Sequence, residues 1–276
     1  MQRRAHDPGL NSLIITGASS GIGRALALEY ARPGQTFLLC GRNAERLEAT
    51  AAAVRKKGAI AELCCVSVRD APAFAAVITG FDARCPVDGL FFVAGVKAGN
   101  QDAIEPAPEV RRVIDVNLVS VILAVQVLLP SLRSRGSARI VLVSSFAALT
   151  PRGELLSYSA SKAAIMAYGT ALRRELRGTG LSVTTVVPGF VDTPMTDRHL
   201  GPAPMLVPAE KAARIIRRGV AARRARVVFP RLLAFGVWWQ EWLPPRLSDL
   251  IGERFRAGVL ADDDELGRRG DEGNSP

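Results

Sequence analysis

The chain has 276 residues, of which 48% are apolar, and a formal net charge of +10. This length suits one large domain with a sizeable core, and the apolar content excludes a disordered chain. No run of about 20 apolar residues occurs, so an ordinary membrane-spanning helix is not expected.

The N-terminal end and the few cysteines and histidines bear on location and metals. Residues 1–9 are basic and polar and lack the apolar stretch of a secretory signal. The cysteines are Cys40, Cys64, Cys65 and Cys85. Because they form no C-x-x-C pair, we expect reduced core thiols in a cytoplasmic protein. Two histidines are too few for a metal site to be expected.

The first predicted strand, 12–15, leads into a glycine-rich turn at 16–23 and then a helix. This arrangement places a dinucleotide pyrophosphate on a helix N-terminus. Gly17 permits the tight turn, Gly21 lets the backbone approach the phosphates, and Gly23 allows close helix–strand packing. The turn therefore predicts a dinucleotide site, with a plain strand–helix turn as the alternative.

The second predicted strand, 36–40, ends at Gly41-Arg42-Asn43. In a dinucleotide fold this strand end meets the adenosine ribose, where an acid favours NAD and an arginine favours the 2′-phosphate of NADP. A planar guanidinium such as that of Arg42 binds phosphate in bidentate fashion. Arg42 therefore predicts NADP(H), with an exposed turn arginine as the alternative. Asn43 is expected to cap the helix at 44–57.

Strands and helices alternate along the rest of the chain. The remaining strands are expected at 61–68, 88–93, 139–143, 181–187 and 226–229, and the remaining helices at 24–31, 70–84, 106–129, 158–177 and 208–223. This alternation predicts an α/β fold of the Rossmann type, a doubly wound parallel sheet with helices on both faces.

A single domain is expected over residues 1–260. Its cofactor and catalytic core is expected at 10–195, and a substrate-side lid with C-terminal helices at 196–260. Residues 261–276 are charged and contain glycine, which predicts a disordered tail.

A tyrosine and a lysine share one face of the helix predicted at 158–177. Tyr158 and Lys162 are four residues apart. A tyrosine hydroxyl has a reference pKa of about 10, and an ammonium one turn away favours the phenolate, so we expect Lys162 to lower the pKa of Tyr158. The pair predicts a proton donor or acceptor that needs no histidine. The spacing by itself also fits an ordinary helix pair.

Together, the glycine pattern and Tyr158-x-x-x-Lys162 resemble the short-chain dehydrogenase/reductase superfamily over about residues 10–195. The resemblance implies hydride transfer between a nicotinamide and a carbonyl or secondary alcohol, with Tyr158 as proton donor and Lys162 on the cofactor ribose. It implies that Ser145, thirteen residues before Tyr158, is the catalytic serine rather than Ser144. It also implies that Asn117 completes a proton relay, with a polar core residue at a helix kink as the alternative.

The resemblance further implies which residues bind NADP(H). They are Gly17, Ser19, Ser20, Gly21, Ile22, Gly23, Arg42, Ser67, Ala94, Gly95, Tyr158, Lys162, Pro188, Gly189, Val191 and Thr193. The chain departs from the family pattern at Ser67, where relatives commonly carry aspartate, and at Phe92 and Val93, where they carry two asparagines. These departures keep open a second hypothesis, a catalytically weak NADP-binding regulator.

The C-terminal part combines arginines with a tryptophan-rich segment. Seven arginines crowd one stretch: Arg214, Arg217, Arg218, Arg223, Arg224, Arg226 and Arg231. All three tryptophans lie in 232–243, whose apolar residues cover nearly the whole helical circumference. Tryptophan suits a lipid interface, and arginine attracts anionic headgroups. The segment predicts peripheral contact with the inner membrane face, with a core or dimer helix as the alternative.

The predicted substrate is therefore a bulky apolar or lipid-like ketone, for example a 3-ketosphinganine-like lipid. A peripheral membrane module is the third hypothesis for the chain. Nucleic-acid motifs are missing from the sequence, so no nucleic-acid partner is expected. The apolar helix at 106–129 is expected to pack on the sheet or on a second subunit, and the chain is expected to form a homodimer or homotetramer.

Overall fold

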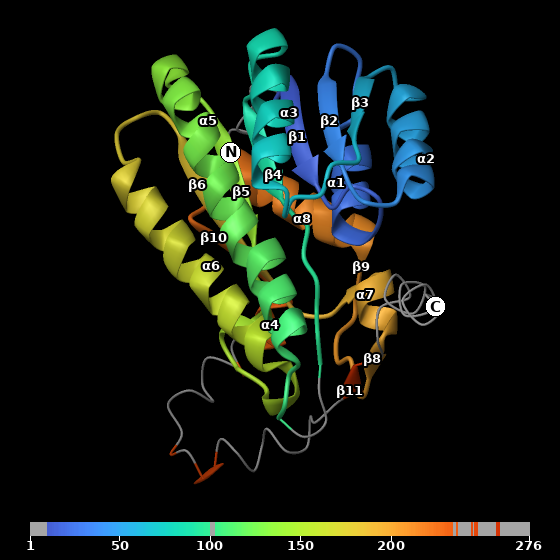
Figure 1. Cartoon of the computed structure of the whole chain (residues 1–276), viewed down its shortest axis with the longest axis vertical. Coiled ribbons are helices and arrows are strands. Elements are labelled where there is room, and N and C mark those ends of the chain that lie inside the picture. The colour runs from blue at the N-terminus through green and yellow to red at the C-terminus, as the bar shows by residue number, and fades with distance from the viewer. Residues whose placement is uncertain are drawn as a thin grey trace, which may run out of the picture.

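Seven parallel strands form the central sheet of the computed structural model, in the order β10-β6-β5-β4-β1-β2-β3 (Figure 1). The structure describes residues 10–99 and 103–233, with 236, 244, 246–247 and 258–259 beyond them. The strands are β1 (Ser12–Thr16), β2 (Thr36–Cys40), β3 (Ile60–Cys64), β4 (Gly89–Phe92), β5 (Arg139–Val143), β6 (Ser182–Pro188) and β10 (Arg226–Phe229). Every neighbouring pair is parallel, which confirms the predicted Rossmann-type fold.

Helices cover both faces of the sheet, as Figure 1 shows. One layer holds α1 (Gly21–Tyr30), α2 (Ala44–Arg55) and α8 (Ala209–Ala221), and the other holds α3 (Ala71–Arg84), α5 (Ser120–Arg135) and α6 (Leu156–Glu175). Buried apolar side chains fill the two spaces between sheet and helices. Strands β1 and β5 are buried along their whole length, and apolar residues run unbroken through 13–15 and 140–143, as expected for strands covered on both faces.

The chain order reverses between β1 and β4, which are neighbours in the sheet. The crossover after β1 runs toward β2 on one side, and the crossover after β4 runs toward β5 on the other. In open parallel sheets, ligands bind outside the carboxyl ends of the strands at such a reversal. This topology therefore fixes where a ligand site is expected.

The helix expected at 106–129 is interrupted in the structure. Helix α4 (Ala107–Ile114) passes through a π-helical turn, Asp115–Val119, into α5. Among the described residues, the helical stretch Ala107–Arg135 is long and apolar enough to cross a membrane, by length and composition alone. No helix of this kind was expected from the sequence. Val121, Val125 and Leu128 of this stretch are buried between the sheet and its helices, and 39% of its apolar window is buried.

Short elements follow β6 on the cavity side of the sheet. They are β7 (Val191–Asp192), α7 (Pro194–Asp197), β8 (His199–Leu200), β9 (Val207–Pro208) and β11 (Gly258–Val259). β9 pairs with β7, and β11 pairs with β8. The three tryptophans and the tail predicted at 261–276 lie outside the described residues.

Two expectations about individual segments were wrong. The third strand ends at Cys64, not at residue 68, because a turn closed by the hydrogen bond from Asp70 N–H to Ser67 C=O follows it. The cysteines do not all lie in the core either. Cys40 and Cys64 are buried, whereas Cys65 is exposed and Cys85 is partly exposed.

Candidate active site

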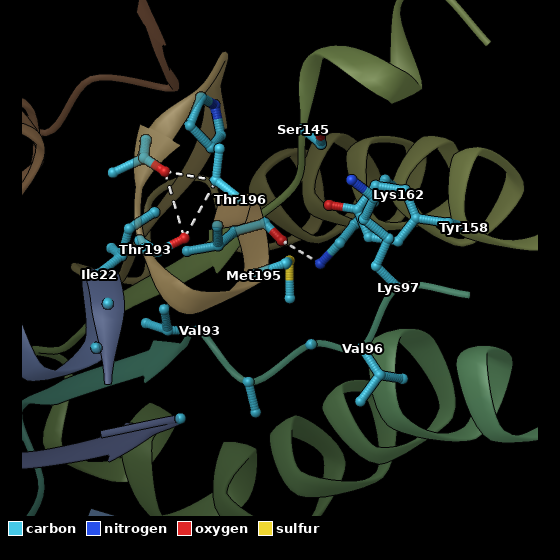
Figure 2. A pocket seen from close by; sticks show the side chains of 18 of the residues that line it. Ile22, Val93, Val96, Lys97, Ser145, Tyr158, Lys162, Thr193, Met195 and Thr196 are labelled. Carbon is cyan, nitrogen blue, oxygen red and sulfur yellow. Dashed lines mark hydrogen bonds between the residues drawn. The ribbon is translucent and has the colours of Figure 1, made fainter. Parts of the chain in front are cut away.

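A cavity of about 630 Å³ opens at the carboxyl ends of the strands, where the strand order reverses. Every predicted cofactor-binding residue lines it, as do Ser145, Tyr158 and Lys162. Asn117 is the one predicted site residue that does not line this cavity. Figure 2 shows Ile22, Val93 and Thr193 on one side of the cavity and Tyr158 and Lys162 on the other.

The glycine-rich turn after β1 has no room for a side chain at Gly17 or at Gly23. Gly17 has a φ of 69°, and a Cβ there would lie 2.8 Å from the Ala94 nitrogen. A Cβ at Gly23 would lie 2.1 Å from the Gly17 oxygen. Helix α1 starts at Gly21 with no side-chain cap, and first-turn N–H groups have no partner within a helix. A backbone cradle of this kind at a helix N-terminus fits a pyrophosphate.

Arginines lie at the end of the cavity where β2 and β3 finish. Arg42 follows β2, as predicted from the sequence, and Ser67 follows β3. Arg69 also lines the cavity, and sequence reasoning missed it although it stands only two residues after Ser67. The next helix, α2, is capped as expected, because Asn43 Oδ1 accepts the Arg46 N–H at 2.8 Å. Two guanidinium groups beyond the carboxyl ends of neighbouring strands suit a phosphate.

The two serines after β5 have different surroundings. Ser144 is buried and donates its hydroxyl to the Lys162 carbonyl oxygen at 2.7 Å, so it ties β5 to α6. Ser145 is partly exposed, lines the cavity and forms a side-chain hydrogen bond with Tyr158. Both serines line the cavity, but Ser145 is the one that contacts Tyr158.

Burial controls the acidity of the Tyr158–Lys162 pair. Burial raises the pKa of Tyr158, and the hydrogen bond with Ser145 opposes that rise. The lowering expected from the sequence was wrong, because desolvation by burial is the largest cause acting on the hydroxyl. The Lys162 Nζ lies 5.7 Å from the ring centroid. Burial also lowers the pKa of Lys162 to about 8. At neutral pH the tyrosine is therefore protonated and the lysine mostly charged.

Asn117 lies behind the cavity wall, in the π-helical turn, and holds the chain that follows β4. Its Oδ1 accepts the Val96 N–H at 2.8 Å, and its Nδ2 donates to the Val96 carbonyl at 2.9 Å. The same Nδ2 donates to Ser161 Oγ at 3.0 Å. Because the side chain is buried from solvent, these three bonds supply the hydrogen-bond partners that its amide group needs. Asn117 thereby joins the loop after β4 to the catalytic helix α6.

The departures from the family pattern at Phe92 and Val93 are accommodated by packing. Phe92 is buried in the core layer beneath α5, where a second asparagine would need polar partners. The strand end is held instead by Thr16, whose Oγ1 accepts the N–H groups of Val93 and Ala94, both at 3.1 Å. The end of β4 is therefore anchored without the two asparagines.

A basic cluster that sequence reasoning missed lines the same cavity. It consists of Lys97, Arg152 and His199, from the loop after β4, the loop before α6 and strand β8. Lys97 Nζ lies 3.5 Å from His199 Nδ1. Burial, with Arg198 and Arg152 adding to it, lowers the pKa of Lys97 to about 8. No motif or spacing joins these residues in the sequence.

Comparison with known proteins places these features in one family. The family model described as "short chain dehydrogenase" matches residues 11–200. A curated protein named "Uncharacterized oxidoreductase" from Myxococcus xanthus is 33% identical over 244 residues, 88% of this chain and 96% of its own length. "Ketoacyl reductase HetN" from Nostoc sp. is 32% identical over 181 residues, 65% of this chain and 63% of its own.

A solved structure is similar in fold and sequence. It is that of a candidate NAD(P)-dependent gluconate 5-dehydrogenase from Beutenbergia cavernae, with NADP bound at low occupancy. Its TM-score is 0.70 and its sequence identity 28%, over 79% of this chain and 94% of the other.

Proposed function

Since the chain belongs to the short-chain dehydrogenase family and is an oxidoreductase of the NAD(P)-dependent type, we propose that it is an NADP(H)-dependent reductase that converts a ketone into a secondary alcohol. The observation that carries this proposal is the protonated, buried Tyr158 beside Ser145 in a cavity that also contains the glycine cradle. The reverse oxidation uses the same groups in the opposite direction.

The residues present fit a bound dinucleotide. A Cβ on Gly17 or Gly23 would overlap backbone atoms, so the turn leaves bare backbone for a pyrophosphate to approach. Arg42, Arg69 and Ser67 suit the adenosine end, where the guanidinium groups favour a 2′-phosphate over a bare ribose. The relative from Beutenbergia cavernae binds NADP, which supports this choice.

The chain's own groups handle the proton and the carbonyl oxygen. When bound, the nicotinamide supplies the hydride. Tyr158 donates its proton to the oxygen of the substrate carbonyl, and Ser145 donates a hydrogen bond to that oxygen as negative charge develops on it. The Lys162 ammonium, held by the Val143 carbonyl at 3.0 Å, binds the cofactor ribose and stabilises the phenolate that remains.

The substrate that we propose is a bulky apolar or lipid-like carbonyl compound. Apolar side chains line much of the cavity, including Val96, Val116, Phe146, Leu155, Phe190 and Met195. Such a surface favours a substrate with an apolar body. A substrate series of rising chain length tests this, because kcat/KM is expected to rise with each methylene group that the cavity buries. A flat profile would leave a small soluble carbonyl compound as the substrate.

The exposed arginines support the proposal of peripheral contact with an anionic membrane from the cytoplasmic side. Arg214, Arg218 and Arg224 are exposed, whereas Arg217 is partly buried and pairs with Glu29 at 2.6 Å. Flotation of the full chain with anionic vesicles is the test, and the double variant Arg214→Glu/Arg218→Glu should remain in solution. Equal flotation of both proteins, or none of the wild type, would count against this contact.

A homodimer or homotetramer is also proposed. Val119, Leu123 and Val127 are each partly exposed and are spaced four residues apart, so they form one apolar stripe from the π-helical turn along α5. Light scattering of the wild type and of Leu123→Glu tests this, since a charge in the stripe should shift the assembly toward monomer.

The decisive test of the enzyme proposal is Tyr158→Phe. NADPH consumption with a panel of ketones should fall at least about 100-fold, the contribution typical of a positioned proton donor, while NADPH affinity stays unchanged. Tyr168→Phe is the matched control, because this tyrosine lies on the same helix outside the cavity. Stoichiometric NADPH binding without turnover of any ketone by the wild type would favour the regulator instead.

Arg42→Ala tests the cofactor. The substitution should weaken NADPH binding by roughly 1.5–3 kcal/mol, the value of a hydrogen bond to a charged group, and barely change NADH binding. Fluorescence titration of both nucleotides gives the comparison, with Arg46→Ala on the exposed side of α2 as control. Equal losses for the two nucleotides would show that Arg42 does not contact a 2′-phosphate.

A further inference from the structure

The basic cluster of Lys97, Arg152 and His199 has no part in the proton transfer proposed above. All three residues line the cavity that contains Ser145 and Tyr158. Figure 2 shows the Lys97 side chain on the same side of the cavity as Tyr158 and Lys162. The cluster therefore borders the same cavity as the hydroxyl groups of Ser145 and Tyr158.

The backbone holds Lys97 in place. The preceding residue, Val96, is buried and is bonded through both its N–H and its carbonyl to Asn117. Just before it, Gly95 lies so close to Lys162 that a Cβ would be 3.2 Å from the lysine Nζ. The position of Lys97 relative to the catalytic helix is therefore set before any substrate binds.

Arg152 and His199 are also anchored. The Arg152 N–H donates to Ser159 Oγ at 3.5 Å, and its carbonyl accepts the Leu155 N–H at 3.0 Å. The His199 ring packs on Phe190, with ring centroids 4.9 Å apart. Its Nε2–H donates to the Pro202 carbonyl at 3.3 Å, which leaves Nδ1 to accept from Lys97. The ring therefore positions Lys97, and a preorganised donor loses little freedom when a ligand binds.

Among the described residues, more positive than negative groups act on Lys97, because, besides burial, Arg198 and Arg152 lower its pKa and Glu154 raises it. Arg152 pairs with Glu154 at 3.6 Å, and Arg198 also lies close enough to lower the pKa of Lys97. With its pKa lowered to about 8, Lys97 is still mostly cationic at neutral pH. Burial, with the Lys97 charge adding to it, lowers the pKa of His199, which is neutral and contributes no charge of its own. A partly buried cation is stabilised by an anionic partner.

We propose that Lys97 and Arg152, with His199 positioning Lys97, form a subsite for an anionic group, a carboxylate or a phosphate ester, on the molecule whose carbonyl is reduced. The inference rests on the proposed reductase function and narrows its substrate class. Because the cavity is otherwise largely apolar, the substrate combines an apolar body with a negative group near the ketone. An ammonium at that place is repelled, so a sphinganine-like amine is disfavoured within the lipid-like class.

The experiment compares ketones that share one carbon skeleton. Oxodecanoates with the ketone at different positions are assayed beside their methyl esters, the matching amino ketones and keto-alkyl phosphates of equal length. For the wild type, kcat/KM should be roughly ten- to a hundred-fold higher for one of the two anions than for the neutral ester. The better of the carboxylate and the phosphate identifies the group. Equal values for anion and ester overturn the proposal.

Variants of Lys97 connect that preference to the cluster. Lys97→Gln should remove the advantage of the anion and leave the ester unchanged, whereas Lys97→Arg should keep most of it. Lys56→Gln, at an exposed lysine after α2, is the matched control. Arg152→Gln provides a second variant if Lys97→Gln does not fold, as judged by circular dichroism. A proportional loss for anion and ester alike overturns the proposal.

A binding measurement separates this proposal from the reductase function. Decanoate and decyl phosphate are titrated calorimetrically into the protein saturated with NADP⁺. If no ketone is reduced but one anion binds to the wild type and not to Lys97→Gln, the reductase function fails and the subsite stands. If neither anion binds, or both proteins bind equally, the subsite fails whatever the ketone assays show.

Discussion

Asn117→Ala tests how firmly the loop after β4 is tied to the catalytic helix. The substitution removes the acceptor of the Val96 N–H and the donor to the Val96 carbonyl, at 2.8 and 2.9 Å in the structure. Both backbone groups lie in the buried interior, where an unsatisfied donor or acceptor costs about 1–3 kcal/mol. The hydroxyl of Ser161 keeps its bond to the Tyr158 carbonyl and adds little to the loss. The loss of partners for these two backbone groups should together lower the free energy of unfolding by roughly 2–6 kcal/mol.

Urea-induced unfolding followed by circular dichroism measures this loss. Asn43→Ala is the matched control, because it also removes an asparagine that accepts one backbone N–H, at the exposed start of α2. Loss of that cap should cost about 1 kcal/mol. If Asn117→Ala proved no more destabilising than Asn43→Ala, the argument that the amide anchors Val96 would be refuted.

Two further predictions concern packing and pH. Gly219→Ala in α8 would place a Cβ 2.2 Å from Val227 Cγ2 and should lower the free energy of unfolding by about 1–3 kcal/mol. Gly80→Ala in α3 is the comparison, because its Cβ would meet only open space and the end of an arginine side chain. That substitution should raise the free energy of unfolding by about 0.5–1 kcal/mol. Burial raises the pKa of Asp82, but hydrogen bonds from Arg135 and neighbouring groups outweigh burial, so the net pKa is lowered. The carboxylate therefore stabilises the fold at pH values above the pKa of an unfolded aspartate, which is about 3.9. Asp82→Asn should therefore lower the free energy of unfolding by roughly 1.5–3 kcal/mol at pH 7. The difference in this free energy between the wild type and the variant should shrink as the pH falls below about 4. A difference that stays constant down to pH 3 would contradict the lowered pKa.

Local spacing determined much of the fold and of the site. Gly17 and Gly23 stand where a Cβ would strike backbone, and the strand before them is an unbroken apolar run, so the turn is recognisable from a short stretch alone. Tyr158 and Lys162 need only one helical turn to share a face. Strands 36–40, 139–143 and 226–229 have the bounds read from the sequence, because their apolar runs end at turn residues.

Properties that depend on burial were not available from spacing. The pKa of Tyr158 moves upward because desolvation of the buried ring exceeds the effect of the hydrogen bond with Ser145. A helix kink at Asn117 was among the sequence predictions, but the π-helical form of the turn Asp115–Val119 was hidden, because an apolar stretch has the same appearance whether its turns are α- or π-helical. Cys65 was expected in the core, yet the strand ends one residue before it and leaves it exposed.

The sequence by itself indicated the strand order along the chain, the glycine-rich turn and the Tyr158–Lys162 pair, because each depends on residues that are near one another in the chain. Only the tertiary structure brought Lys97, Arg152 and His199 to one cavity wall. These three come from separate loops and a short strand, and their approach depends on the sheet, on the Asn117 bonds to Val96 and on the packing of Phe190. Contacts between distant segments arise from the packed core as a whole, and a one-dimensional pattern does not record them.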